Sequence, residues 1–283
     1  MTSASPQSGE ADMRTQIPED VLDLVQRWLG LRLERDTAAY GNTGTTAGFR
    51  SDAGTWVRLQ RRSVFSMNGQ SWTGAECASV LQGVAKPELL RSVRWRDDDR
   101  EAVWRADEMT LVDSAVISPN GSVTADPQLP DAWWSGLATS LAALSRHETE
   151  RVGMRQEHVT RRIREVFGDG IETTIDEWRT AHADLHWGNL TAPTCHLLDW
   201  EDWGSGPRGL DAATLWGFSL GVPSLADRIQ HEFSDELQSR SGTIAMLLFC
   251  ANALRAATRT GRSMPFTEPA RTAASGLMTQ LDQ

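Results

Sequence analysis

The chain has 283 residues, a net charge of −10 at neutral pH and a 40% share of hydrophobic residues, which is typical of a folded globular protein rather than a disordered one. A nucleic-acid-binding protein needs a basic face, so the acidic balance argues against that class and favours a cationic partner. The longest unbroken apolar run, Ile244 to Ala251, covers 8 residues. A membrane span needs about 20, so we expect no membrane partner.

The basic residues are unusual because Lys86 is the only lysine and all the others are arginine. Any mechanism that needs a lysine, such as a Schiff base, would have to use that one residue. The three cysteines are far apart in the sequence. Their number and spacing argue against a disulfide framework or a zinc site and indicate a reducing compartment, so we expect a cytoplasmic protein. The sequence gives no indication of the oligomeric state.

The first part of the chain is predicted to be rich in strands. Residues 1–16 are polar and lack an apolar core, so we expect a disordered leader and not a signal peptide. A helix is predicted over Pro18–Leu29, because its apolar residues fall on one face. After it, strands alternate with turn-forming residues. The predicted strands are Leu31–Tyr40, Thr45–Arg50, Thr55–Arg61, Leu90–Arg96 and Glu101–Met109, with a helix over Gly74–Val84 among them.

Helices dominate the chain from Pro130 onward. The predicted helical segments are the stripe of Trp133, Leu137, Leu141 and Leu144, then His158–Phe167, Leu210–Leu220 and Thr243–Ala257, with a hairpin over His182–Trp200 between them. A strand-rich part followed by a helical part is an α+β pattern. We therefore expect an N-terminal lobe over residues 17–113 and a C-terminal lobe over residues 114–283.

The most informative segment contains the pattern His182-x-Asp184-Leu185-x-x-x-Asn189, followed by an apolar strand that ends at Asp199. Kinase catalytic loops have the pattern H-x-D-L-x-x-x-N and are followed by a strand that ends in a metal-binding aspartate. Phosphoryl transfer needs a carboxylate that accepts or orients the proton of the substrate hydroxyl, which assigns that role to Asp184. Mg²⁺ prefers oxygen ligands, which makes Asn189 and Asp199 the candidate metal ligands. We expect His182 to brace the loop by hydrogen bonds.

These residues, together with Leu198-Asp199-Trp200-Glu201 and Gly206-Pro207-x-x-x-Asp211, resemble the aminoglycoside phosphotransferase and choline kinase-like family of small-molecule kinases. The resemblance implies a bilobal protein-kinase-like fold and the ATP-dependent transfer of a γ-phosphate to a hydroxyl. It implies that Asp184 is the base and that Asn189 and Asp199 hold Mg²⁺. It also implies that Asp211 is a structural residue, which ties the following helix to the catalytic loop.

The N-terminal lobe departs from the family pattern, which places a lysine on the third strand and pairs it with a helix glutamate. Here Trp56-Val57-Arg58-Leu59 occupies that strand. We infer that Arg58 replaces the lysine and pairs with Glu76, which keeps the charge and changes the geometry of phosphate binding. The phosphate loop is expected at Gly41–Gly44. Its candidate nucleotide-binding residues are Asn42, Thr43 and Gly44. ATP is the expected nucleotide, and GTP stays open.

The candidate substrate-binding residues lie within or beside the catalytic loop: His186, Trp187, Glu201, Asp202 and Trp203. Carboxylates at this place would attract a substrate that carries ammonium groups, so we expect a cationic small molecule or peptide. An aminoglycoside, or a basic cyclic peptide of the tuberactinomycin type such as viomycin or capreomycin, fits this description. Phosphorylation would add about two negative charges to such an antibiotic and so weaken its recognition by an anionic RNA target.

Four other interpretations stay open at the level of the sequence. A metabolic kinase of the same fold could act on choline, homoserine, methylthioribose or a sugar, and the tryptophans near residue 200 could form an aromatic cage for choline. A nucleotide-binding pseudokinase would explain an arginine at position 58. A metal-dependent hydrolase could use His182, Asp184 and His186 as ligands, but it leaves Asn189 and Asp199 unexplained. A turn-rich hairpin without any catalytic role is the fourth.

Overall fold

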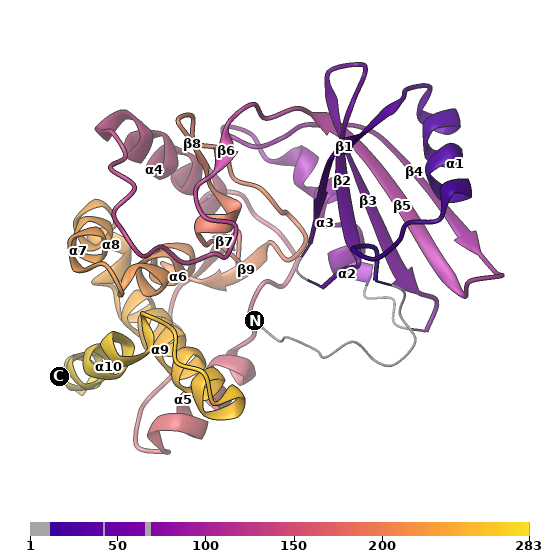
Figure 1. Ribbon diagram of the computed structural model, residues 1–283. Helices are drawn as coiled ribbons and strands as arrows, with labels where there is room; N and C mark the ends of the chain where they lie inside the picture. The colour runs from indigo at the N-terminus through magenta and orange to yellow at the C-terminus, as the bar shows by residue number, and fades with distance from the viewer. Residues whose placement is uncertain (1–11, 42, 66–68, 283) are drawn as a thin grey trace. The chain divides into compact units, whose positions relative to one another are not determined.

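The computed structural model describes residues 12–41, 43–65 and 69–282, and the chain forms two compact units (Figure 1). The first unit comprises Met1–Ser79 and Pro87–Asp113, and the second comprises Val80–Lys86 and Ser114–Gln283. The main division therefore falls after Asp113. The short segment Val80–Lys86, which lies inside the expected N-terminal lobe, belongs to the second unit. Among the described residues, no helix combines the length and the apolar character that crossing a membrane requires.

The first unit is built on an antiparallel sheet of five strands in the order β1-β2-β3-β5-β4. The strands are β1 (Leu33–Tyr40), β2 (Thr46–Ser51), β3 (Thr55–Ser63), β4 (Leu89–Asp97) and β5 (Ala102–Thr110). Each differs from its predicted range by at most two residues at either end, because alternating side chains and turn residues mark strands clearly. Helix α1 (Glu19–Leu29) supplies the apolar side chains that complete the core of this unit.

The two faces of the central strands differ in chemistry. Val57 and Leu59 of β3 and Trp104 of β5 are buried in the core that α1 completes. Because successive side chains in a strand point to opposite faces, Arg58 of β3 and Arg105 of β5 lie on the other face. That polar face is the place where a nucleotide-binding role was expected.

The helix predicted over Gly74–Val84 is much shorter than expected. The structure has α2 (Gly69–Trp72), α3 (Gly74–Cys77) and a 3₁₀ turn, η1 (Ala78–Val80), in this region. Thr73 separates α2 from α3, and its hydroxyl donates to the carbonyl oxygen of Gly69 at 2.9 Å. Gly83 has φ +74°, which an α-helix does not allow. Glycine has a low helix propensity, and the apolar periodicity alone did not reveal these interruptions.

Helices form most of the second unit. They are α4 (Asp131–Ser145), α5 (Gln156–Phe167), α6 (Leu210–Ser219), α7 (Pro223–Glu232), α8 (Ser234–Leu237), α9 (Arg240–Thr260) and α10 (Thr267–Leu281). Helix α9 packs against α5, α6 and α10. At Gly217 of α6, an added Cβ would come within 2.2 Å of the Phe249 ring of α9. Glycine at this position therefore allows α6 and α9 to approach each other closely.

Two short strand pairs frame the segment with the kinase-like pattern. Strand β7 (Trp178–Ala181) pairs with β9 (Gly204–Pro207), and β6 (Ala115–Val116) pairs with β8 (Thr191–Ala192). The 3₁₀ turn η2 (Trp187–Asn189) lies between β7 and β8. Because Ala181 is opposite Gly204, the start of the His182 segment lies beside the end of the loop that follows Asp199.

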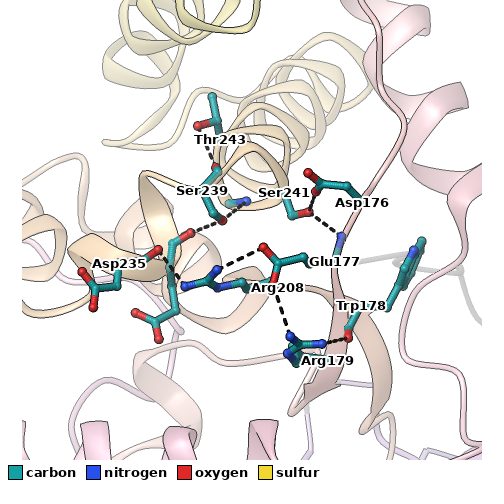
Figure 2. A network of polar contacts seen from close by, with 11 residues as sticks. Asp176, Glu177, Trp178, Arg179, Arg208, Asp235, Ser239, Ser241 and Thr243 are labelled. Carbon is teal, nitrogen blue, oxygen red and sulfur yellow. Dashed lines mark hydrogen bonds and ion pairs between the residues drawn. The ribbon is translucent and has the colours of Figure 1, made fainter.

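A polar network holds the far end of the β7–β9 pair (Figure 2). The guanidinium of Arg208 donates to the carboxylate of Glu177 at 3.1 Å and to the carbonyl oxygen of Asp235 at 3.1 Å. The hydroxyl of Ser241, in the first turn of α9, donates to the carboxylate of Asp176 and accepts from the backbone N–H of Glu177. This network ties the strand pair to the helices α8 and α9.

Candidate functional site

Asp211, in the first turn of α6, holds the backbone at the start of the loop. Its two carboxylate oxygens accept from the N–H of His182 at 2.8 Å and from the N–H of Ala183 at 2.9 Å. Ala183 has φ +67°, a left-handed conformation that costs free energy in any residue other than glycine. Burial raises the pKa of Asp211, while these backbone bonds lower it. The expected structural role of Asp211 therefore has a direct geometric basis.

His182 connects the loop to the strand that precedes Asp199. Its ring is fully buried, and its Nε2 donates to the carbonyl oxygen of Leu198 at 2.7 Å. The ring lies edge-on to the indole of Trp200, with 4.8 Å between the ring centroids. A ring in this position can brace the loop, as expected, but it cannot reach a substrate.

Asp184 lies on the loop itself and keeps a partly open side chain, 39% exposed. The side-chain amide of Asn189 donates to the carbonyl oxygen of Asp184 at 2.8 Å, which fixes the backbone at Asp184. Partial removal from water, followed by the carboxylates of Asp199 and Asp202, raises the pKa of Asp184 to about 7. Asp184 is therefore partly desolvated and close to other carboxylates, an arrangement that a divalent cation would stabilise.

Asn189 and Asp199 come from neighbouring segments of the same unit. The N–H of Leu198 donates to the carbonyl oxygen of Asn189 at 2.9 Å, which places Asp199 one residue beyond this contact. Asp199 is exposed and has φ +62°. The amide nitrogen of Asn189 is used by Asp184, so its amide oxygen is the atom left for a cation. One amide oxygen and one carboxylate suit Mg²⁺ bound with nucleotide phosphates.

The position of His182 argues against the alternative of a metal-dependent hydrolase. That alternative uses His182 as one of three ligands, but its ring is fully buried and bonded through Nε2 to the carbonyl oxygen of Leu198. A kinase needs fewer protein ligands because the nucleotide supplies phosphate oxygens.

His186 is held in one orientation beside Asp184. Its Nδ1 accepts from the N–H of Gly188 at 3.0 Å, so in the neutral ring the proton is on Nε2. Nε2 lies 3.7 Å from the Asp184 carboxylate, too far for a direct hydrogen bond. The ring packs edge-on against Phe218 of α6, and burial lowers the pKa of His186 to about 4. The imidazole is therefore neutral near pH 7 and presents an N–H next to the carboxylate.

Trp187 is a core residue, which corrects its assignment as a substrate contact. Its side chain is completely buried, stacks on Trp133 with 6.2 Å between the ring centroids, and donates from Nε1 to the hydroxyl of Ser219 at 2.9 Å. The assignment failed because neighbouring positions of a loop can point to opposite sides, and sequence proximity to Asp184 does not distinguish them.

Replacing Trp187 by Phe is expected to lower the free energy of unfolding by about 2 kcal/mol, because the buried hydroxyl of Ser219 loses its donor and the core loses volume. The Michaelis constants should stay within about twofold of the wild-type values. Urea denaturation and steady-state kinetics measure the two quantities. Trp28→Phe is the control, since Trp28 is half-exposed on α1. If the stability is unchanged and the Michaelis constant for the acceptor is clearly higher, Trp187 contacts the substrate after all.

The other candidate substrate-binding residues differ in their exposure to solvent. Trp203 is buried, and its ring lies under the guanidinium of Arg151, with 4.8 Å between the Arg151 Cζ and the ring centroid. It therefore supports the loop, which corrects its assignment to substrate binding. Asp202 is exposed and Glu201 is intermediate, so both carboxylates remain candidates for a cationic ligand.

In the first unit, the structure places the guanidinium of Arg105 against Glu76. The guanidinium of Arg105 lies 3.3 Å from Glu76, donates to the carbonyl oxygen of Trp72 at 2.8 Å and pairs with the buried Asp107 at 2.7 Å. Because Gln60 pairs with Arg105 and Arg58 with Asp107, Arg105 lies two positions farther along the same face than Arg58. Arg105 and Asp107 are two positions apart on one strand, and this spacing is the sequence signal for an ion pair on one face of the sheet.

The expected phosphate loop is only partly consistent with its assignment. Asn42 lies outside the described residues. The N–H of Gly44 donates to the carbonyl oxygen of Gly41 at 3.0 Å, so a tight turn uses the donor that a phosphate would need. The hydroxyl of Thr43 bonds to that of Thr45 at 2.7 Å. Gly44 is therefore corrected to a turn residue, with φ +72°.

Comparison with known proteins shows the fold. No family model and no curated protein sequence matches the chain. Aminoglycoside phosphotransferase APH(4)-Ia matches with a TM-score of 0.59 at 11% identity, over 92% of this chain and 98% of that chain. An amicoumacin kinase in complex with AMP-PNP and Ca²⁺ matches with a TM-score of 0.55 at 11% identity, over 95% of both chains. A GDP complex of an aminoglycoside 2′-phosphotransferase matches with a TM-score of 0.55 at 10% identity, over 95% of this chain and 98% of that chain. The chain thus has the bilobal protein-kinase-like α+β fold of these proteins.

Proposed function

We propose that the protein is a cytoplasmic kinase that transfers the γ-phosphate of ATP, with Mg²⁺, to a hydroxyl of a cationic small molecule or peptide. The observation that carries the proposal is the single loop in which Asp184, Asn189 and the neighbouring Asp199 are held together by backbone contacts. The fold supports it, since structures with this fold are described with ADP, AMP-PNP and GDP. The GDP complex keeps GTP open as an alternative donor.

In the proposed reaction, the carboxylate of Asp184 accepts the proton of the substrate hydroxyl as the oxygen attacks the γ-phosphorus, and ADP leaves. His186 would orient the same hydroxyl, because its Nε2–H and the Asp184 carboxylate are 3.7 Å apart. One oxygen atom can lie within hydrogen-bond distance of both groups at that separation. Asn189 and Asp199 would hold Mg²⁺, which neutralises the charge of the phosphates when bound.

We propose an antibiotic as the substrate: an aminoglycoside, or a basic cyclic peptide such as viomycin or capreomycin. The accessible carboxylates of Glu201 and Asp202 lie two and three residues after Asp199, and the net charge of −10 favours a cationic ligand. One related fold is described with hygromycin B. Phosphorylation by such an enzyme would confer resistance. The choline alternative loses its main support, because the indoles of Trp187, Trp200 and Trp203 are all buried.

Mass spectrometry tests this proposal directly. The protein is incubated with ATP and Mg²⁺ and with viomycin, capreomycin, hygromycin B, choline, homoserine or methylthioribose in turn. We expect one of the basic antibiotics to gain the mass of a phosphoryl group. Turnover of choline or homoserine alone would establish a metabolic kinase instead. Nucleotide binding without turnover of any acceptor would favour a pseudokinase.

Arg58 stays the proposed phosphate-binding side chain of the first unit. Replacing Arg58 by Ala is expected to raise the Michaelis constant for ATP about tenfold or more, because a charge-assisted contact to phosphate is lost. Arg27→Ala is the matched control, since Arg27 is an exposed arginine in the last turn of α1; it should change this constant by less than about twofold. Steady-state kinetics with varied ATP measures both. If Arg58→Ala leaves the constant unchanged, another group binds the phosphates.

A further inference from the structure

Arg151 contacts the loop Asp199–Trp203 at two backbone positions. Its Nε donates to the carbonyl oxygen of Trp203 at 3.0 Å, and its Nη2 donates to the carbonyl oxygen of Glu201 at 2.9 Å. The same guanidinium lies over the face of the Trp203 ring. From these contacts we infer that Arg151 is a positioning residue for the proposed metal-binding loop. The inference rests on the proposed kinase function.

The backbone of Arg151 is itself firmly placed. Its carbonyl oxygen accepts from the N–H of Ser205 at 2.7 Å, and the N–H groups of Gly153 and Met154 donate to the carbonyl oxygen of Ser205 at 3.0 and 2.9 Å. An added Cβ at Gly204 would come within 2.5 Å of the nitrogen of Gly153, so the two segments touch at their backbones. The side chain of Arg151 therefore starts from a fixed point beside β9 and reaches back over the loop.

The loop needs such support because its local structure is unfavourable. It lies outside any helix or strand, so its carbonyl groups lack the partners that a regular element supplies. Asp199 adopts a positive φ of 62°, a conformation that is unfavourable in residues other than glycine. The carboxylates of Asp199, Glu201 and Asp202 repel one another. The guanidinium of Arg151 donates to two of these carbonyl groups, and its positive charge opposes the repulsion between the carboxylates.

The consequence concerns the affinity for the metal ion. When the loop is held, the carboxylate of Asp199 is already in place, and binding the ion does not have to order it. Trp200 fixes the other part of the loop, since its Nε1 donates to the carbonyl oxygen of Leu197 at 2.8 Å. Loss of the Arg151 contacts would therefore release the loop on the side of Glu201 and Trp203. A lysine would keep the charge but could not reproduce the two-pronged geometry.

Binding of Mn²⁺ in the presence of AMP-PNP tests the inference without turnover. Electron paramagnetic resonance measures the dissociation constant for Mn²⁺. We expect Arg151→Lys to raise this constant about tenfold, because about one charge-assisted hydrogen bond is lost. Binding of AMP-PNP in EDTA should stay unchanged. If Arg151→Lys does not fold, Arg151→Gln carries the same test, because its amide can donate to only one of the two carbonyls.

Arg208→Lys is the matched control. Arg208, like Arg151, donates to two acceptors, here a carboxylate and a backbone carbonyl, but at the opposite end of the β7–β9 pair (Figure 2). We expect it to lower the melting temperature and to leave the Mn²⁺ dissociation constant within about twofold. A Mn²⁺ constant that is unchanged in Arg151→Lys, or raised equally in Arg208→Lys, would overturn the inference. A wild-type protein that binds neither AMP-PNP nor Mn²⁺ would instead overturn the proposed function.

Discussion

Replacing Asp184 by Asn is expected to lower kcat about a thousandfold, because the amide cannot accept the proton of the substrate hydroxyl. The fold and the binding of AMP-PNP should persist, since the backbone contacts of this loop do not involve the Asp184 side chain. The rate of ADP formation with the acceptor identified by mass spectrometry measures the loss, and calorimetry measures nucleotide binding. A kcat within about tenfold of the wild-type value would exclude Asp184 as the base.

The same variant should alter stability in a pH-dependent way. The pKa of Asp184 in the folded, metal-free protein is raised to about 7 from its ordinary value of 3.8, mainly by burial. Folding therefore opposes its ionisation, and the wild-type protein loses stability as the pH rises from 3.8 to about 7. Asp184→Asn lacks this loss. Its melting temperature in EDTA should exceed that of the wild type by more at pH 8 than at pH 5.

Asp169→Asn serves as the control for both measurements. Asp169 follows α5, and its side chain is 93% exposed, so neither activity nor the pH dependence of stability should change. If Asp184→Asn shows the same melting difference at pH 5 and at pH 8, folding does not raise the pKa of Asp184.

Replacing Asp211 by Ala is expected to be the most damaging change to the fold. It would leave the buried N–H groups of His182 and Ala183 without an acceptor, at about 1 to 3 kcal/mol each. We therefore expect the free energy of unfolding to fall by about 4 kcal/mol, together with most of the activity. Asp211→Asn keeps one acceptor oxygen, so its free energy of unfolding should lie between those of the wild type and Asp211→Ala. Urea denaturation followed by circular dichroism measures the series.

Asp176→Asn is the comparison for this series. Asp176 accepts from the hydroxyl of Ser241 at the opposite end of the β7–β9 pair, and it is exposed. Its replacement should destabilise the protein much less than the loss of Asp211. Equal stability of Asp211→Ala and the wild type would show that the two backbone N–H groups find other acceptors, and the proposed support of the loop would then be wrong.

Most of the fold could be predicted from the sequence because its elements have clear periodicity. The strands of the first unit alternate in polarity and are separated by glycine-containing turns, and the helix α1 has one apolar face. The region of α2 and α3 could not be predicted, because these helices have four residues each and are shorter than the window in which periodicity is visible. Contacts from a distant strand hold them instead: Arg105 of β5 donates to the carbonyl oxygen of Trp72, the last residue of α2, and pairs with Glu76 of α3.

The candidate site was predictable where local spacing determines the geometry. His182, Asp184 and Asn189 lie on one loop, and hydrogen bonds between neighbouring residues bring Asp199 next to them. The partners from distant parts of the chain were not predictable. Arg151 is about fifty residues from the loop that it contacts, and no local pattern marks it. The direction in which Trp187 points was also invisible, because a loop has no fixed period.

The support that Asp211 gives to the loop has a consequence for hydrogen exchange. Irregular loops normally exchange their amide hydrogens quickly, because they open locally without unfolding the protein. The amides of His182 and Ala183 are donated to a buried carboxylate at the start of α6. They can exchange only when that carboxylate is exposed, which requires α6 to leave the core. The chemically important loop is thus expected to be among the last segments to open, with the protection of a buried helix rather than that of a surface loop.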